Sequence, residues 1–174
     1  MRLFFALWPE SQVVAEFSVL AQDAARHWGG RATRPETLHL TLAFLGEVAA
    51  ERLPAVQEAA AGVEAAGFCL NLDRLGYWSH NHLFWAGCTQ IDAAVQALAE
   101  DLAQRLRAQG FRLEDRRFVP HMTLVRKMMT PPDRLPVVSA MSWNCREFVL
   151  VRSLSVRGGV DYNRLAAWAL GTGE

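Results

Sequence analysis

The chain has 174 residues, of which 51% are hydrophobic and 21% charged, and its formal net charge is zero. This length fits one ordinary domain, or two small lobes that share a core. A neutral chain has no overall attraction for nucleic acid, so any anion that it binds must be held by a local cluster of charges. No apolar run reaches the length of a membrane span, and the three cysteines fit neither a zinc motif nor a disulfide framework. We therefore expect a reduced, cytoplasmic protein.

The first half of the chain reads as alternating strands and helices. Helices are indicated by apolar residues at helical spacing, strands by short apolar runs, and their ends by glycine and proline. The predicted elements are a strand at residues 3–8, a helix at 11–27, a strand at 38–46 and a helix from about 53 to 67.

The second half begins with a predicted hairpin and continues with the clearest helix of the chain. Val95, Leu98, Leu102 and Leu106 mark the buried stripe of this helix, and Gly110 ends it. The predicted elements are strands at residues 68–77 and 82–88, a helix at 91–109, a strand within 112–127, a strand within 143–156 and a last strand at 161–170.

Two of these strands contain the pattern His-x-Thr in an otherwise apolar sequence. The first contains His39 and Thr41, and the second contains His121 and Thr123. Side chains two residues apart in a strand lie on the same face, so each histidine shares a face with its threonine. A β-α-β unit carries each pattern, and the two histidines are about half a chain length apart. We interpret this as an internal duplication that forms two α+β lobes across a cleft.

Two histidines that face one cleft suit acid–base chemistry on a phosphate ester. An imidazole titrates near neutrality, so one ring can accept a proton while its partner donates one. Each such role is typically worth about 10²–10⁴-fold in rate. The threonine hydroxyls can donate to phosphate oxygens. Two histidines from separate strands, with no evident carboxylate beside them, would be a poor zinc site, so we expect no metal and no cofactor.

The residues around both patterns resemble a known family. Residues 34–46 and 116–126 resemble the paired motifs of the two-histidine (2H) phosphoesterases, and within that group the RNA 2′,3′-cyclic phosphodiesterases, once called 2′-5′ RNA ligases. Residues 3–8 and 83–87 resemble that family as well, so the resemblance spans nearly the whole chain. It implies a LigT-like α+β fold with two pseudo-symmetric lobes, each an antiparallel sheet backed by helices, in one bilobal domain of residues 1–174.

The resemblance also implies a metal-independent reaction at an RNA end. The family opens a 2′,3′-cyclic phosphate to a 2′-phosphomonoester. By this resemblance His39 would protonate the departing 3′ oxygen, His121 would activate the water, and Thr41 and Thr123 would bind the phosphate. Arg126 lies at the family's arginine position, but strict alternation from His121 puts it on the opposite face. It reaches the phosphate only if the strand bulges or ends near Val125.

Recognition of the remaining RNA is expected from a local patch of aromatic and basic residues. Phe118 and Trp78 are candidates for stacking on a base, a contact worth roughly 1–3 kcal/mol. Arg34 and Arg117 flank the two patterns and are candidates for contacts with the RNA backbone. The competing interpretations are packing within the core or a loop for the aromatic residues, and a solvated face for the arginine run at residues 112–117.

Three alternatives to hydrolysis of RNA ends stay open at this point. The same chemistry in reverse would join a 2′,3′-cyclic phosphate end to a 5′-hydroxyl without ATP. A non-catalytic module could use the two patterns only to hold phosphate at an RNA end. A related phosphodiesterase could act on another cyclic phosphate, because the patterns read the phosphate and not the base. The balanced charge and the lack of an exposed heptad pattern favour a monomer.

Overall fold

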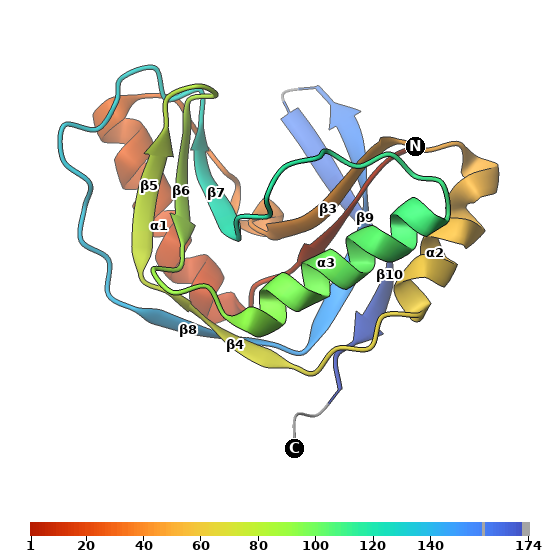
Figure 1. The fold of residues 1–174 in the computed structure, drawn as a ribbon. Helices are drawn as coiled ribbons and strands as arrows, with labels where there is room; N and C mark the ends of the chain where they lie inside the picture. The colour runs from red at the N-terminus through yellow and green to blue at the C-terminus, as the bar shows by residue number, and fades with distance from the viewer. Residues whose placement is uncertain (158, 172–174) are drawn as a thin grey trace.

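The computed structural model describes residues 1–157 and 159–171 (Figure 1). Its main sheet has eight strands in the order β10-β9-β1-β3-β7-β6-β5, with β2 paired to β7 beside this path, and β4 and β8 form a second, two-stranded sheet. The pairs between these strands are antiparallel. The strands are β1 (Arg2–Leu7), β2 (Arg31–Ala32), β3 (Leu40–Glu47), β4 (Phe68–Leu72), β5 (Arg74–Trp78), β6 (Leu83–Gly87), β7 (His121–Arg126), β8 (Met141–Cys145), β9 (Glu147–Val156) and β10 (Gly159–Ala169). The helices are α1 (Ser11–Trp28), α2 (Leu53–Ala61) and α3 (Ala93–Ala108), with short 3₁₀ turns η1 (Pro35–Thr37) and η2 (Ala50–Arg52).

The main sheet consists of two halves that meet at its centre. Strands β10, β9, β1 and β3 form one half, and β7, β6 and β5 form the other. In the described chain, β3 and β7 pair through Leu40 and Met122. This confirms the expected α+β architecture of antiparallel sheets and helices, and it joins the two lobes through the two strands that carry the His-x-Thr patterns.

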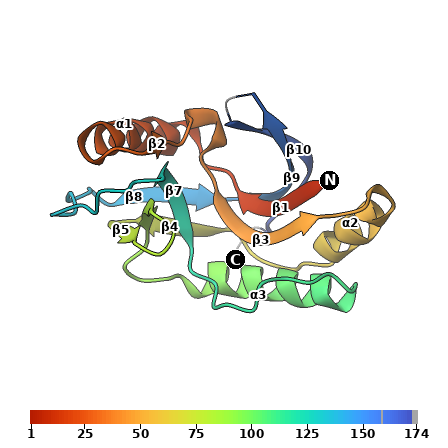
Figure 2. The same ribbon diagram turned by 90° about the horizontal axis from the view of Figure 1, so that it is seen from above.

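The helices connect the halves by packing across them. Helix α1 follows β1 in the chain but packs against β2 and β7, whereas α3 follows β6 but packs against β3 and α2. Figure 2 shows α1 and α3 on opposite sides of the strands. The half that contains β7 is therefore covered by α1, which comes directly after β1 of the other half. The half that contains β3 is covered by α3, which comes directly after β6.

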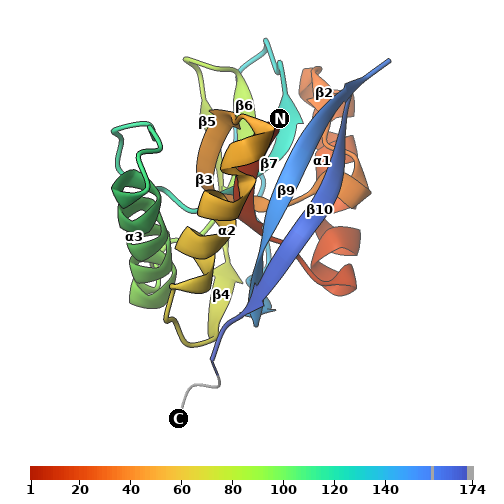
Figure 3. The same cartoon turned by 90° about the vertical axis from the view of Figure 1, so that its right-hand side faces the viewer.

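Both faces of β1 are buried, as its continuous apolar sequence indicates. Leu3, Phe5 and Leu7 belong to the main core, whereas Phe4 and Ala6 form a small second cluster with Val149 and Val151 of β9. Trp8 and Tyr162 pack against this second cluster. The β9–β10 hairpin runs beside β1 along one side of the molecule (Figure 3).

The chain passes from one sheet to the other within two of the predicted segments. The segment 68–77 breaks at Asp73, whose N–H donates to the carbonyl of Gly87 at 3.1 Å and whose Oδ1 accepts from the Thr89 N–H at 2.6 Å. Within residues 143–156 the predicted strand, at 148–151, lies inside β9, and the chain changes sheet before it, at Arg146, so that β8 pairs with β4 and β9 pairs with β1. A run of apolar residues cannot reveal that a strand changes its partner sheet.

The helix ends also differ from the sequence-based expectation. Helix α2 ends at Ala61, because the chain already turns at Gly62 and not at Gly67. Helix α3 begins at Ala93 because the Asp92 carboxylate accepts from the Ala94 N–H at 2.7 Å and caps it. Its predicted stripe of Val95, Leu98, Leu102 and Leu106 is buried. No helix in the described ranges is long and apolar enough to cross a membrane.

Candidate active site

The two His-x-Thr patterns lie side by side where the halves of the sheet meet. Because Leu40 pairs with Met122 in an antiparallel register, His39 is brought opposite Thr123, and Thr41 is brought opposite His121. The four polar side chains are therefore related by an approximate twofold axis through the Leu40–Met122 pair. The structure brings together the two half-sites that the sequence predicts.

A bulge in β7 turns Arg126 toward the histidines. Phe84 pairs with Val125 and Trp85 with Thr123, so Leu124 is an extra residue in β7. Leu124 and Val125 are consecutively buried, which is the expected result of an interrupted alternation. Arg126 consequently lies on the face of His121 and Thr123, near enough for its charge to act on both imidazoles. Strict alternation from His121 would have put Arg126 on the opposite face of the strand, and the bulge returns it to the face of His121.

Strand β3 has the same bulge at the corresponding position. Phe5 pairs with Ala43 and Ala6 with Thr41, so Leu42 is the extra residue. Counted from each histidine, the residue that corresponds to Arg126 is therefore Phe44. Phe44 is 39% exposed, and the guanidinium carbon of Arg2 lies 5.1 Å from the centre of its ring. The two half-sites match at histidine and threonine but differ here, with a cation in one and an aromatic ring in the other.

Each imidazole is anchored by the backbone two residues earlier. The His39 Nδ1 donates to the carbonyl of Thr37 at 2.7 Å, and the His121 Nδ1 donates to the carbonyl of Val119 at 2.7 Å. A carbonyl oxygen only accepts, so the proton of each neutral ring is on Nδ1 and the lone pair is on Nε2. Both rings therefore have an Nε2 that can accept or, when the ring is charged, donate a proton.

The surroundings lower the pKa of both histidines. The pKa of His39 is lowered from 6.5 to about 4, mainly by burial and in addition by Arg126 and His121, against the opposing effect of the hydrogen bond to Thr37. Burial also lowers the pKa of His121, against the hydrogen bond to Val119 and together with the charges of Arg116 and Arg126. Both rings are accordingly neutral near pH 7 when no anion is bound.

Aromatic rings surround the two histidines unequally. Around His39, Phe4 lies at 4.9 Å between ring centroids, Tyr162 at 5.3 Å edge-on, and Trp8 at 5.5 Å with an interplanar angle of 12°. His121 contacts Trp78 edge-on at 4.6 Å. The His39 ring therefore has more aromatic neighbours than the His121 ring.

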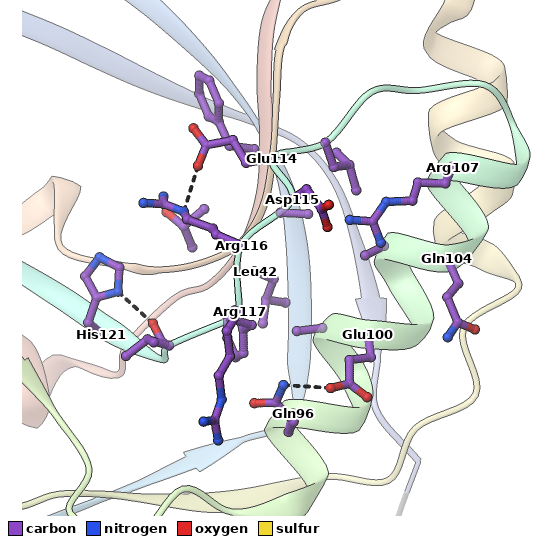
Figure 4. Close-up of a pocket in the computed structure, with 18 of the residues that line it drawn as sticks. Leu42, Gln96, Glu100, Gln104, Arg107, Glu114, Asp115, Arg116, Arg117 and His121 are labelled. Carbon is purple, nitrogen blue, oxygen red and sulfur yellow. Dashed lines mark hydrogen bonds and ion pairs between the residues drawn. The ribbon is translucent and has the colours of Figure 1, made fainter.

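A cavity of about 540 Å³ extends from the His121 side of the site toward α3. Figure 4 shows Arg117 of the segment before β7 pointing toward Gln96 of α3, whereas Arg116 turns away from α3 toward Glu114. Arg116 forms an ion pair with Glu114 at 2.7 Å, and Gln96 donates to Glu100 at 2.7 Å. The wall between these polar groups includes apolar side chains, namely Leu42, Ala43, Phe44, Ala99, Ala103 and Phe118. Such a mixture of apolar walls and a few polar groups is typical of sites for small organic ligands.

The structure places three of the four candidate RNA contacts in this cavity. Trp78, Arg117 and Phe118 line it. Arg34 is not one of its lining residues: its guanidinium donates to the Val160 carbonyl at 2.6 Å and forms ion pairs with Glu36 at 3.3 Å and Asp161 at 3.8 Å. Arg34 thus ties the segment before β3 to β10.

Sequence reasoning did not find three aromatic neighbours of the site. Trp8 and Tyr162 contact His39, and Phe44 lines the cavity. An alignment of residues 39–44 with residues 121–126 would have indicated Phe44, because it occupies the place of Arg126. No local pattern indicates Trp8 or Tyr162, since strand order alone brings β1 and β10 to His39. Within the described ranges, no three His, Cys, Asp or Glu side chains are grouped so that they could hold a metal ion.

Comparisons with known proteins agree with this geometry. The RNA 2′,3′-cyclic phosphodiesterase of Escherichia coli is 34% identical over 172 residues, which cover 97% of this chain and 96% of that protein. The enzyme of the same name from Thermus thermophilus is 33% identical, with 98% of this chain and 90% of that protein covered. The crystal structure of E. coli LigT complexed with 3′-AMP superposes with a TM-score of 0.91 at 33% identity, and covers 97% of both chains. The family model described as LigT like Phosphoesterase matches residues 7–85 and 87–162, so the chain belongs to the LigT-like phosphoesterase family.

Proposed function

We propose that the protein is an RNA 2′,3′-cyclic phosphodiesterase, a hydrolase that opens the terminal cyclic phosphate to a 2′-phosphomonoester without a metal ion. One observation carries this proposal. Two imidazoles, related by the approximate twofold axis, each have an Nε2 that is not used by the backbone hydrogen bond, and the guanidinium of Arg126 lies near both rings. The family relatives named for this activity, at about a third identity over nearly the full chain, support it.

In the proposed reaction, His121 is the general base and His39 the general acid. The Nε2 of His121 takes a proton from water as the water oxygen bonds to phosphorus. The bond from phosphorus to the 3′ oxygen breaks, and the Nε2 of charged His39 gives its proton to that oxygen. The products are a 2′-phosphate and a 3′-hydroxyl, and proton exchange with solvent restores both rings. Each role is worth about 10²–10⁴-fold in rate.

Binding of the anionic substrate favours protonation of His39, which is neutral near pH 7 in the free protein. A cyclic phosphate diester carries one negative charge, and a nearby anion favours the charged imidazole. The anion therefore offsets the effect of burial and of Arg126 on the pKa of His39. Thr41 and Thr123 donate to the non-bridging oxygens, and the guanidinium fork of Arg126 stabilises the charge that increases in the transition state.

The cavity on the His121 side is the proposed place of the terminal nucleoside. Its volume of about 540 Å³ is within the range of small-ligand sites. Trp78 and Phe118 offer aromatic faces for a base, and Arg117 offers a cation for the preceding phosphate. We propose in addition that the protein is a cytoplasmic monomer, and that joining of a cyclic phosphate end to a 5′-hydroxyl, if it occurs, uses the same groups.

The proposal is tested with a short RNA that ends in a 2′,3′-cyclic phosphate, incubated with the protein in EDTA. We expect complete conversion to a terminal 2′-phosphate, identified by phosphorus NMR. A 3′-phosphate would reverse which oxygen leaves and would contradict the proposed geometry. No conversion by folded protein would contradict RNA ends as the substrate. A parallel reaction with a second RNA carrying a 5′-hydroxyl detects ligation.

A further inference from the structure

The most unequal feature of the two half-sites is the stack of rings on His39. The Trp8 indole lies nearly parallel to the imidazole, at 12° and 5.5 Å. The Arg164 guanidinium carbon lies 4.7 Å from the Trp8 ring centroid, and Tyr162 meets both rings edge-on, at 5.3 Å from His39 and 6.1 Å from Trp8. Among the described residues, His121 has no ring contact with so small an interplanar angle.

Two strands far apart in the sequence build this stack. Trp8 follows β1, whereas Tyr162 and Arg164 lie two residues apart on β10 and share a face of that strand. A cation over an indole ring is attracted electrostatically to the face of that ring. The stem and charge of Arg164 therefore hold Trp8 in place from the edge strand of the sheet.

From this geometry we propose that Trp8, held by Arg164, is a positioning residue that fixes the plane of the His39 imidazole and keeps water from its face. The hydrogen bond to Thr37 fixes only the Nδ1 end of the ring. Parallel contact with Trp8 adds the second constraint, so that Nε2 has one direction in the site. The inference deepens the proposed function, since it concerns the acid of that reaction.

The stack also affects the pKa of His39. The titratable and charged groups that face this ring are His121 and Arg126 of β7 and Tyr162 of β10, and Arg164 reaches it through Trp8. Burial is the largest cause of the lowered pKa, and Trp8 is one of the groups that bury the ring. Removing the indole admits water, which favours the charged imidazole and raises the pKa.

The test is an NMR titration of the His39 imidazole between pH 3 and 8, over the range in which the protein stays folded. Wild type should titrate near the lower end, and Trp8→Leu should raise the midpoint by at least ~1 pH unit. Trp8→Phe, which keeps a stacked ring, should stay close to wild type, and Arg164→Met should lie between the two. The matched control is Trp168→Leu, because Trp168 contacts Phe5 and Phe148 in the main core and should leave the midpoint unchanged.

Kinetics separate this inference from the proposed function. With the cyclic phosphate substrate, Trp8→Leu should lower kcat by roughly 10-fold with little change in KM, because a displaced acid binds substrate but reacts slowly. An unchanged His39 midpoint in Trp8→Leu overturns the positioning role even if wild type is active. If the wild-type protein hydrolyses no RNA end but Trp8→Leu still raises the His39 midpoint, the positioning role of Trp8 is supported and the proposed reaction is contradicted.

Discussion

The lowered pKa values of both histidines have a direct consequence for the pH dependence of the reaction. A ring that is buried, or faced by Arg126, loses its proton at a lower pH than a free imidazole with a pKa of 6.5. In a coupled pair, activity requires one proton shared between two rings, and it falls below the lower and above the upper macroscopic pKa.

We therefore predict a bell-shaped profile of kcat/KM that is centred on the acid side of pH 6.5. The value of kcat/KM reports the free enzyme, in which both pKa values are lowered. The two limbs follow the two macroscopic pKa values of the coupled pair, which burial and Arg126 lower. Initial rates at low substrate between pH 3.5 and 9 measure this, and a profile centred well above 6.5 would contradict the lowered pKa values.

The matched variant for this profile is Arg126→Gln. Loss of a positive charge near both rings raises both pKa values, so both limbs should move to higher pH. The maximum should fall by about 10²-fold or more, because a charge-assisted contact with the phosphate is lost. Arg34→Gln removes a cation that is bound to Val160 and Asp161 instead, and it should leave the profile in place.

At this scale the sequence predicted the residues that carry a repeated pattern. His39, Thr41, His121 and Thr123 could be found because each His-x-Thr shares a strand face, whatever the fold around it. The sequence could not show which face of β7 Arg126 occupies, because the bulge depends on how β7 pairs with β6 and the local alternation of apolar and polar residues does not indicate it. For the same reason the sequence did not indicate Trp8 and Tyr162, which only tertiary packing brings to His39, or Arg164, which packing brings to Trp8.

At the scale of elements, the turn from α1 into β2 supports the bulge of β7. Arg31 pairs with Arg126 and Ala32 with Val125, and the Thr33 N–H donates to the Leu124 carbonyl at 2.8 Å. Gly30 precedes this contact with φ of +92°. A Cβ there would lie 2.8 Å from the Arg126 carbonyl oxygen and 2.8 Å from Val125 Cγ1.

We predict that Gly30→Ala disturbs both stability and the site, whereas Gly29→Ala mainly affects stability. Gly29 also has a positive φ, +78°, but a Cβ there meets nothing within 4 Å. Both variants lose about 1–2 kcal/mol from the left-handed backbone, and Gly30→Ala loses about 1–3 kcal/mol more from the collision with β7.

Urea unfolding and turnover of the two glycine variants check this prediction. Gly30→Ala should have the lower midpoint and a reduced kcat, because Arg126 moves with the backbone of β7. Equal stabilities and equal kcat values would mean that the turn does not support the bulge.

The elements themselves were predictable where one periodicity ran from end to end. Helix α3 was the clearest case, since its buried stripe and its final glycine are both local signals. The changes of sheet at Asp73 and Arg146 were not predictable, because a single residue separates the two strands in each case and the sequence does not indicate which strand each one pairs with.

At the scale of the whole molecule, we propose that residues 1–174 fold as one bilobal domain. The halves of the main sheet meet at the Leu40–Met122 pair. Helix α1 directly follows β1 but packs on β7 of the other half, and α3 directly follows β6 but packs on β3 of the other half. Neither half can thus complete its core with its own consecutive residues. A destabilised strand in one half should loosen the other half as well.

The prediction is that Phe5→Leu in β1 raises hydrogen exchange of the slowest β6 amides by the same factor as those of β1. Phe5 is fully buried, and a large core side chain replaced by a smaller one costs on the order of 1–3 kcal/mol. Val137→Ala is the control, because Val137 is 91% exposed and its loss should change neither strand. Unchanged β6 exchange in Phe5→Leu would show two independently unfolding lobes.

The central claim, that two histidines perform metal-free acid–base hydrolysis of an RNA end, is tested most directly by kcat in EDTA for three variants. These are His39→Ala, His121→Ala and the double variant, measured beside wild type with binding of the 2′-phosphate product as the control for an intact site. The account predicts that each single variant loses about 10²–10⁴-fold in kcat, that the double variant loses much less than the product of these factors, and that product binding persists. A single variant that retains most of the wild-type kcat, or a wild type that EDTA inactivates, would contradict it.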